Sequence, residues 1–442
     1  MTAVDFSNIF VIVFLAGTAA SFVIKQTLEF IDFMARRNSR GKIPEILRDI
    51  PAAKEAFSTE KLELICRYEN AKYFDWIPQS VCSLILTIAL VLSGYFPFLF
   101  NKICLITGFP SGILNTFLCF ILFLFFAGLP ESVLSVPFDL YQEFVTEKKF
   151  GFSNMTLGLW IKDQLKASVL SLVLNSILLF AASVMLVKFR SSWWLVLGIL
   201  LIAFTFLMQL IYPKLIAPAF NRFSPIEEGE TKTKIMEVLG KSGFVSDGIF
   251  VMDASRRSGH SNAYFTGFGK SKRIVLFDTL VKKLTPDEIA AVLGHEVGHY
   301  KHRHILKKLV VMIPVEFLLM FALFKIAGSV QLYNGFGFSS INAENIASVQ
   351  FIGLFLAMTL FNAVSKIISP LLKFSSRKNE YEADAYSAKI CGTPEYLISA
   401  LIKLNSDNLS ELFPPKIYVF WNFSHPTLTE RVKALRKSYG HA

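Results

Sequence analysis

Long apolar stretches without charge divide this sequence into alternating segments. A membrane-spanning helix needs about 20 largely apolar residues, because lipid offers no hydrogen-bonding partner to an open backbone. Six such runs contain no Asp, Glu, Lys or Arg, and a seventh contains only Glu316. The pattern therefore predicts seven membrane-spanning helices, at residues 6–24, 76–101, 103–130, 167–187, 191–213, 309–324 and 345–365.

The basic residues between these stretches gather on alternate connections. Of the 45 Lys and Arg residues, 41 lie in the segments 25–75, 131–166, 214–308 and 366–442. Connections rich in Lys and Arg stay in the cytoplasm. We therefore expect a multi-pass membrane protein with its N-terminus outside or in a lumen and its C-terminus in the cytoplasm. The pattern does not distinguish the endoplasmic reticulum from a bacterial inner membrane.

Composition agrees with a membrane protein and excludes several other classes. Hydrophobic residues make up 53% of the 442 positions and charged residues only 18%, which excludes a disordered chain and an ordinary soluble domain. The net charge of +11 is not arranged as a basic stripe interleaved with aromatic residues, so we expect no nucleic-acid partner. The five cysteines include no C-x-x-C pair, which argues against a disulfide framework and a cysteine zinc site.

The clearest chemical signal is an H-E-x-x-H motif at His295, Glu296 and His299. Thr285 followed by Pro286 is typical of a helix start, so the motif is expected on a helix. Two histidines one helical turn apart can bind one Zn²⁺, while the glutamate between them polarises a bound water. The sequence therefore predicts a catalytic zinc site with His295 and His299 as ligands and Glu296 as general base.

A catalytic zinc needs a third protein ligand. The helix-like segment 376–384 contains Glu380, Glu382 and Asp384, and it follows the last predicted span. An antiparallel pair of spans returns this segment to the H-E-x-x-H helix. Spacing alone leaves all three carboxylates open as the ligand, although Glu382 points away from the face shared by Glu380 and Asp384.

Two further histidines, His302 and His304, follow the motif closely. They are too near to complete the zinc site from the same helical face. With four basic neighbours, they are expected to form a basic collar at the membrane surface, together with Lys301, Arg303, Lys307 and Lys308.

Taken together, these residues resemble the integral-membrane zinc metallopeptidases of the CAAX prenyl protease 1 type. The resemblance extends from about residue 60 to about residue 437. Besides H-E-x-x-H, it rests on an S-R-x-x-E-x-x-A-D block at Ser376–Asp384 and on a Ser-His-Pro block at Ser424–Pro426, which is followed by Arg431. It also rests on three aromatic-rich stretches, at Ser261–Phe265, Pro137–Phe152 and Ile211–Phe223.

The resemblance implies roles for particular side chains. It implies that Glu380 is the third zinc ligand and that Asp384 orients a ligating histidine. His425 and Arg431 correspond to a C-terminal active-site pair that donates hydrogen bonds to the developing oxyanion or to the substrate carboxylate. A short edge strand, followed by a turn at Gly267 and Gly269, is implied to pair with the extended peptide through Asn262, Ala263, Tyr264 and Phe265.

We therefore expect an all-α membrane protein whose seven transmembrane helices enclose an intramembrane chamber, with a cytoplasmic zincin-like domain that contains a small β element. The expected divisions are spans one to five, the catalytic segment, spans six and seven, and the third-ligand helix with the C-terminal active-site segment, at residues 1–213, 214–308, 309–374 and 375–442. The expected function is hydrolysis of peptide substrates, C-terminally prenylated CAAX peptides in particular, with one Zn²⁺ per chain. The alternatives are an HtpX-like quality-control protease and a non-enzymatic membrane transporter with a structural zinc site.

Overall fold

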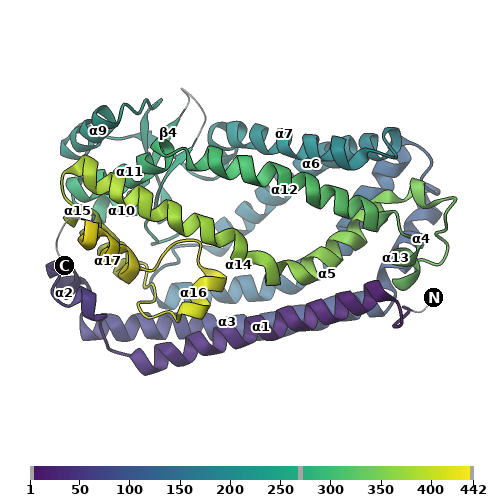
Figure 1. The fold of residues 1–442 in the computed structure, drawn as a ribbon, viewed down its shortest axis with the longest axis horizontal. Coiled ribbons are helices and arrows are strands. Elements are labelled where there is room, and N and C mark those ends of the chain that lie inside the picture. The colour runs from purple at the N-terminus through teal and green to yellow at the C-terminus, as the bar shows by residue number, and fades with distance from the viewer. Residues whose placement is uncertain (1–3, 267–271, 439–442) are drawn as a thin grey trace.

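The computed structural model describes residues 4–266 and 272–438, and it is dominated by long helices (Figure 1). Seven helices of the described residues are long and apolar enough to cross a membrane, which confirms the predicted number of spans. They are α1 (Ile9–Ser39), α3 (Thr59–Leu92), α5 (Ile113–Tyr141), α6 (Leu157–Lys188), α7 (Trp193–Ile211), α12 (His304–Ala327) and α14 (Gln350–Cys391). Short π-helical segments, η2 (Gln142–Glu147) and η3 (Tyr212–Ile216), extend α5 and α7, and α8 (Ala217–Phe220) follows η3.

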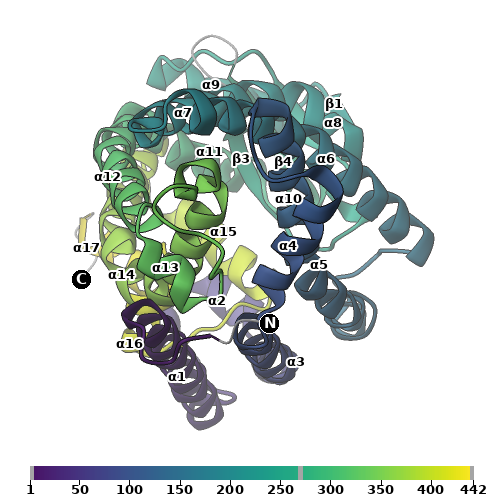
Figure 2. The same ribbon diagram turned by 90° about the vertical axis from the view of Figure 1, so that its right-hand side faces the viewer.

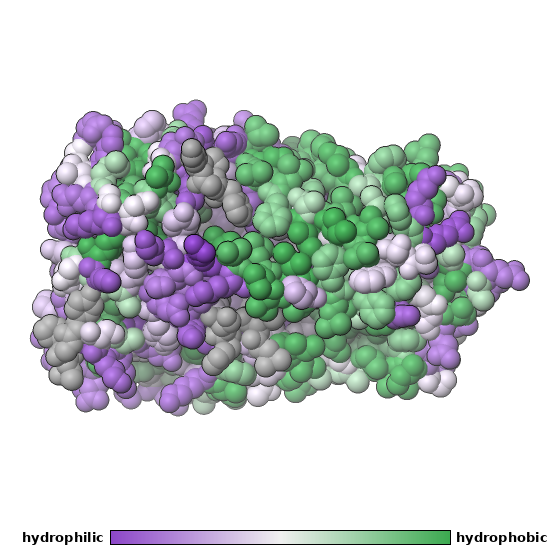
Figure 3. Space-filling view, turned by 45° about the horizontal axis from the view of Figure 1, so that its top comes forward, coloured by the Kyte–Doolittle hydropathy of each residue, from purple (hydrophilic) through white to green (hydrophobic). Residues whose placement is uncertain are grey.

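Consecutive spans run in opposite directions, and in the end-on view they are arranged as a ring (Figures 1 and 2). The N-terminus and the short helices α4 (Tyr95–Thr107) and α13 (Val330–Gly335) lie at one end of the molecule. The sheet and the remaining short helices lie at the other end. A hydrophobic band separates two ends where hydrophilic residues gather (Figure 3), as expected for a membrane protein. The intramembrane chamber stays a prediction.

One predicted boundary between spans is wrong. The sequence placed a connection at Lys102, but this residue lies inside α4. The chain instead turns at Gly94, whose φ of 74° is left-handed and therefore favours glycine, and again between residues 108 and 112. Charge-free runs report where the chain is apolar and carry no information about where it turns. For the same reason α1 and α14 extend beyond their predicted ends as polar helix.

A four-stranded sheet lies at the end of the molecule that is rich in Lys and Arg. Its order is β1-β2-β4-β3, and β2 pairs with β4 in parallel while the other pairs are antiparallel. One face packs on α11 (Pro286–Lys301) and α9 (Glu230–Ser242) through a buried apolar cluster. The strands are β1 (Phe223–Pro225), β2 (Ile249–Met252), β3 (Ala263–Thr266) and β4 (Arg273–Phe277), and the other helices at this end are α2 (Pro51–Ala56), α10 (Asp278–Lys283), α15 (Glu395–Asp407), α16 (Lys416–Asn422) and α17 (Leu428–Ser438).

The helix that carries the last span continues into this end of the molecule. α14 is one helix of 42 residues, and it crosses the expected division between residues 374 and 375. The apolar half of α14 packs against α1, and its polar half packs against α11, α16 and α17. A continuous helix of this length links the membrane part of the protein to the segment in which the third ligand was expected.

Candidate active site

The helix α11 carries the H-E-x-x-H motif, and local sequence explains both its start and its tight packing. Thr285 and Glu288 form a reciprocal capping box at its N-terminus, as the predicted helix start requires. Glycines at 294 and 298 allow close approach to α14. A Cβ at position 298 would lie 2.9 Å from the Cα of Ala383, so a side chain there would force the two helices apart.

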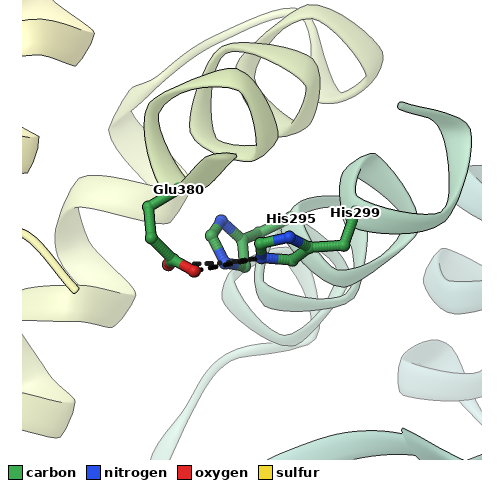
Figure 4. A group of neighbouring side chains, drawn as sticks. All are labelled: His295, His299 and Glu380. Carbon is green, nitrogen blue, oxygen red and sulfur yellow. Dashed lines mark hydrogen bonds and ion pairs between the residues drawn. The ribbon is translucent and has the colours of Figure 1, made fainter. Parts of the chain in front are cut away.

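This close packing brings three side chains together from α11 and α14 (Figure 4). The two Nε2 atoms of His295 and His299 lie 3.2 Å apart. The carboxylate of Glu380 lies 3.4 Å from the first of these atoms and 3.3 Å from the second. Of the three carboxylates that spacing left open, Glu380 is therefore the one that converges with the histidines.

One ligand atom from each of the three residues lies within 4.8 Å of the other two, and the closest contacts, which involve different oxygens of Glu380, are 3.2–3.4 Å. With metal–ligand bonds of about 2.0–2.1 Å, two ligands of a tetrahedral ion lie roughly 3.3 Å apart. In addition, Glu380 Oε2 is buried, and its contact with Nε2 of His295, at 3.4 Å, is an ion-pair contact without the geometry of a hydrogen bond. Two imidazoles and one carboxylate are also the ligand chemistry of catalytic zinc. The residues present therefore fit a metal ion.

Asp384 holds the ring of His295 from the other side. The Nδ1 atom of His295 lies 2.7 Å from a carboxylate oxygen of Asp384, which is almost completely buried. Arg431 donates two hydrogen bonds to the same carboxylate, at 2.9 and 2.6 Å. This arrangement leaves Nε2 of His295 directed at Glu380 and His299. The hydrogen bond from Nδ1 thus selects the tautomer that a metal needs.

His299 is held differently, and here the expectation of a basic collar is wrong for His304. His304 is only 4% exposed, and its Nδ1 lies 2.9 Å from Nδ1 of His299. Its Nε2 lies 3.1 Å from the carboxylate of Glu382. A neutral His304 can accept a hydrogen bond from Nδ1–H of His299 at its own Nδ1 and donate one from Nε2–H to Glu382, which leaves Nε2 of His299 free to face Glu380.

A break in the helix explains why sequence reasoning missed His304. The expectation assumed that α11 continues past His302, but Arg303 adopts a left-handed conformation, with φ of 54°. The chain turns there, α12 begins, and His304 is brought back beside His299. A non-glycine residue at positive φ is uncommon, so periodicity gave no signal of it. The only signal in the sequence was Glu382, whose carboxylate points away from the face shared by Glu380 and Asp384 and could therefore bind a different residue.

Electrostatics at the site favour a charged, paired state in the absence of a metal. Burial acts to lower the pKa of His295, but hydrogen bonds to Asp384 and Glu380 outweigh it and raise this pKa to about 9. Burial acts to raise the pKa of Glu380, but its bonds to His295 and His299 prevail and lower this pKa well below its usual value. A metal that binds here must therefore displace a proton from His295.

The other expected site residues lie nearby. Glu296 follows His295 on α11 and is half-buried, so solvent can reach it. His425 is exposed, with Nε2 3.5 Å from Glu380. Ala263, Tyr264 and Phe265 lie in β3, the edge strand of the sheet, which contacts α11. The expected edge strand is thus confirmed, whereas its role with substrate and the roles of His425 and Arg431 stay predictions. The turn at Gly267 and Gly269 lies outside the described residues.

Two family models match adjoining parts of the chain. Residues 36–222 match the model of the CAAX prenyl protease N-terminal region with five membrane helices, and residues 225–439 match Peptidase family M48. The CAAX prenyl protease 1 of Saccharomyces cerevisiae is 38% identical over 70% of this chain and 71% of its own. The homolog from Dictyostelium discoideum is 34% identical over 90% of this chain and 92% of its own.

A solved structure is similar over almost the whole chain. The crystal structure of S. mikatae Ste24p matches with a TM-score of 0.85 and 31% identity, covering 96% of this chain and 98% of that one. The five-helix N-terminal match distinguishes this chain from the HtpX-like alternative, and the match to a peptidase family opposes a non-enzymatic transporter. The chain therefore belongs to the CAAX prenyl protease 1 family of membrane-embedded M48 zinc metallopeptidases.

Proposed function

We propose that the protein hydrolyses C-terminally prenylated CAAX peptides at a single zinc site formed by His295, His299 and Glu380. The observation that carries this proposal is the convergence of these three side chains at the spacing of zinc ligands. The names of the relatives, CAAX prenyl protease 1 and its homologs, support the substrate class.

The chain supplies the groups that peptide hydrolysis requires. A bound zinc would lower the pKa of a water and polarise the scissile carbonyl. Glu296, which follows His295 on α11, would accept the proton of that water and then pass it to the leaving amine. Asp384 and His304 fix the tautomers of the two histidines. Arg431 acts on Asp384, to which it is bonded, and His425 is the exposed donor next to Glu380.

The substrate is proposed to bind as an extra strand beside β3. This strand pairs with β4 on one side, so its other edge is free among the described residues. An extended peptide can satisfy the open backbone groups of such an edge, and strand addition of this kind is a common mode of peptide recognition. Because β3 also contacts α11, a peptide paired with Asn262–Phe265 would pass the zinc ligands.

The site is proposed to face the cytoplasm. The sheet, α11 and the polar half of α14 belong to the segments 214–308 and 366–442, two of the four segments that together hold 41 of the 45 basic residues of the sequence. The N-terminus lies at the opposite end of the molecule (Figure 1). The bias of Lys and Arg toward cytoplasmic connections supports this orientation.

A paired cleavage assay tests the proposed substrate. One peptide that ends in a CAAX sequence is prepared in farnesylated and in unmodified form, and both are offered to the purified full-length protein. We expect efficient cleavage of the farnesylated peptide and much slower cleavage of the other. Equal rates would exclude specificity for prenylated peptides, and no cleavage of either would contradict the proposed function.

A further inference from the structure

A second cluster of buried charges lies beside the zinc site, and the proposed mechanism does not use it. Arg36 on α1 donates to the carboxylate of Asp32 and, at 3.0 Å, to that of Glu411. Asp32 and Arg36 are 0% and 5% exposed. Two carboxylates thus share one guanidinium, and when both are ionised the cluster carries one uncompensated negative charge.

These carboxylates line a cavity of about 700 Å³. Three of the residues that line it each have one side-chain oxygen that is buried without a hydrogen-bond donor among the described residues: Oδ1 of Asp32, Oε1 of Glu411 and Oδ1 of Asn405. Buried acceptors without a donor destabilise the folded protein. The cavity is therefore built to receive hydrogen-bond donors.

The cavity reaches the active site. Besides the acidic cluster, its lining includes Ser424, His425 and Arg431, and His425 lies 3.5 Å from the zinc ligand Glu380. The helix α16 closes one side and contacts both α1 and α14 (Figure 1). A substrate held at the zinc ligands can thus extend a side chain toward Asp32 and Glu411.

The charge of the cluster indicates the class of its occupant. Glu69 is already paired with Lys72, and Arg431 with Asp384, so one negative charge remains to be compensated. A divalent cation would bring two positive charges to a cluster with one uncompensated negative charge, and Arg36 would repel it more strongly than a singly charged group. A single ammonium or guanidinium group matches both the charge and the unpartnered acceptors, and its hydrogen bonds to carboxylates are of the strong, charge-assisted kind.

We infer that this cavity is a subsite of the active site that binds a Lys or Arg side chain of the peptide substrate. This inference rests on the proposed peptidase function and adds a specificity to it. In the absence of substrate, burial and the nearby charge of Asp32 raise the pKa of Glu411 to about 9. A proton therefore occupies the cluster at neutral pH until the cationic side chain replaces it.

The test compares arginine with citrulline, its neutral isostere, at each position of an otherwise constant farnesylated peptide. At one position the wild-type protein should show a KM roughly tenfold lower for arginine, with little change in kcat. Glu411→Gln should abolish this preference, so that the KM values of the arginine and citrulline peptides become equal, whereas Asp407→Asn should keep it. Glutamine resembles the protonated Glu411 of the free protein, so the variant should fold. Asp407→Asn is the matched control, since Asp407 belongs to α15 but does not line the cavity.

Each outcome decides the inference. Equal KM values for the two peptides at every position, or a preference that persists in Glu411→Gln, would overturn it. If Glu411→Gln does not fold, the wild-type comparison alone is decisive. Failure to cleave either peptide would count against the proposed function, and direct binding of the two uncleaved peptides would then test the subsite.

Discussion

The two histidine ligands are held by different kinds of neighbours. The ring of His295 is bonded to Asp384, whose carboxylate is 2% exposed and bonded twice to Arg431. The ring of His299 is bonded to another histidine, His304, which passes the contact on to Glu382, with 32% of its side chain exposed. One ligand is therefore fixed by a buried ion pair. The other is fixed by a chain of hydrogen bonds from His299 through a neutral His304 to the partly exposed Glu382, which we call the relay. The difference predicts that the site is rigid on one side and adjustable on the other.

Removing Asp384 should have the largest effect. Asp384→Ala leaves Arg431 buried without its partner, which costs about 3–5 kcal/mol of folding free energy. The loss of orientation of His295 should weaken zinc binding by about 100-fold. Thermal unfolding and zinc retention against a graded chelator measure the two effects. Wild-type zinc retention in this variant would show that the buried pair does not position the ligand.

Zinc uptake by the metal-free protein should depend on pH through His295. Because the pKa of this residue is raised to about 9, zinc must displace its proton at neutral pH. The apparent affinity should therefore rise by about tenfold per pH unit between pH 7 and pH 9. Asp384→Asn should make this dependence shallower, since the bond to Asp384 helps to raise the pKa. A flat profile in the wild-type protein would contradict the assignment of that proton.

Breaking the relay on the other side should have a smaller effect. His304→Phe fills the same space but cannot accept the hydrogen bond from His299, so zinc affinity should fall by about tenfold. His304→Asn keeps an acceptor and should recover part of the loss, which a purely steric role for His304 would not explain. If zinc affinity falls equally in the two variants, the hydrogen bond between His304 and His299 does not contribute to zinc binding.

The smallest effect is expected at the exposed end of the relay. Glu382→Gln keeps a hydrogen-bond acceptor for His304 and removes only a partly solvated charge, so zinc affinity should change by no more than about threefold. The same chelator competition measures it. A loss as large as that of Asp384→Ala would show that both ligands are held by equally strong charges, and the comparison would fail.

The contrast also separates what the sequence could predict from what it could not. The seven spans follow from charge-free runs, and the start of the zinc helix follows from Thr285 and Pro286, because each is a local physical requirement. Glu380 was left open by spacing and depended on the family resemblance. His304 was missed because the left-handed conformation of Arg303 ends the helix at a point where the pattern of apolar residues gives no sign of an end.

The acidic cavity lies beyond sequence reasoning for another reason. Asp32 and Glu411 are almost 380 positions apart, and each looks like an ordinary charge at the end of an apolar segment. Only the packing of α16 between α1 and α14 encloses them in one cavity. Contacts between residues so far apart in the sequence produce no periodic pattern from which they could be predicted.

The central claim is that His295, His299 and Glu380 hold a zinc ion whose water is activated by Glu296. It is tested most directly by measuring bound zinc and cleavage of the farnesylated peptide on one preparation of Glu296→Gln. Glutamine keeps the shape of the residue but cannot accept the proton of the water. We predict one zinc per chain and a loss of cleavage of at least about 1,000-fold. Cleavage at the wild-type rate would contradict the claim, as would a wild-type protein that cleaves the peptide without bound metal.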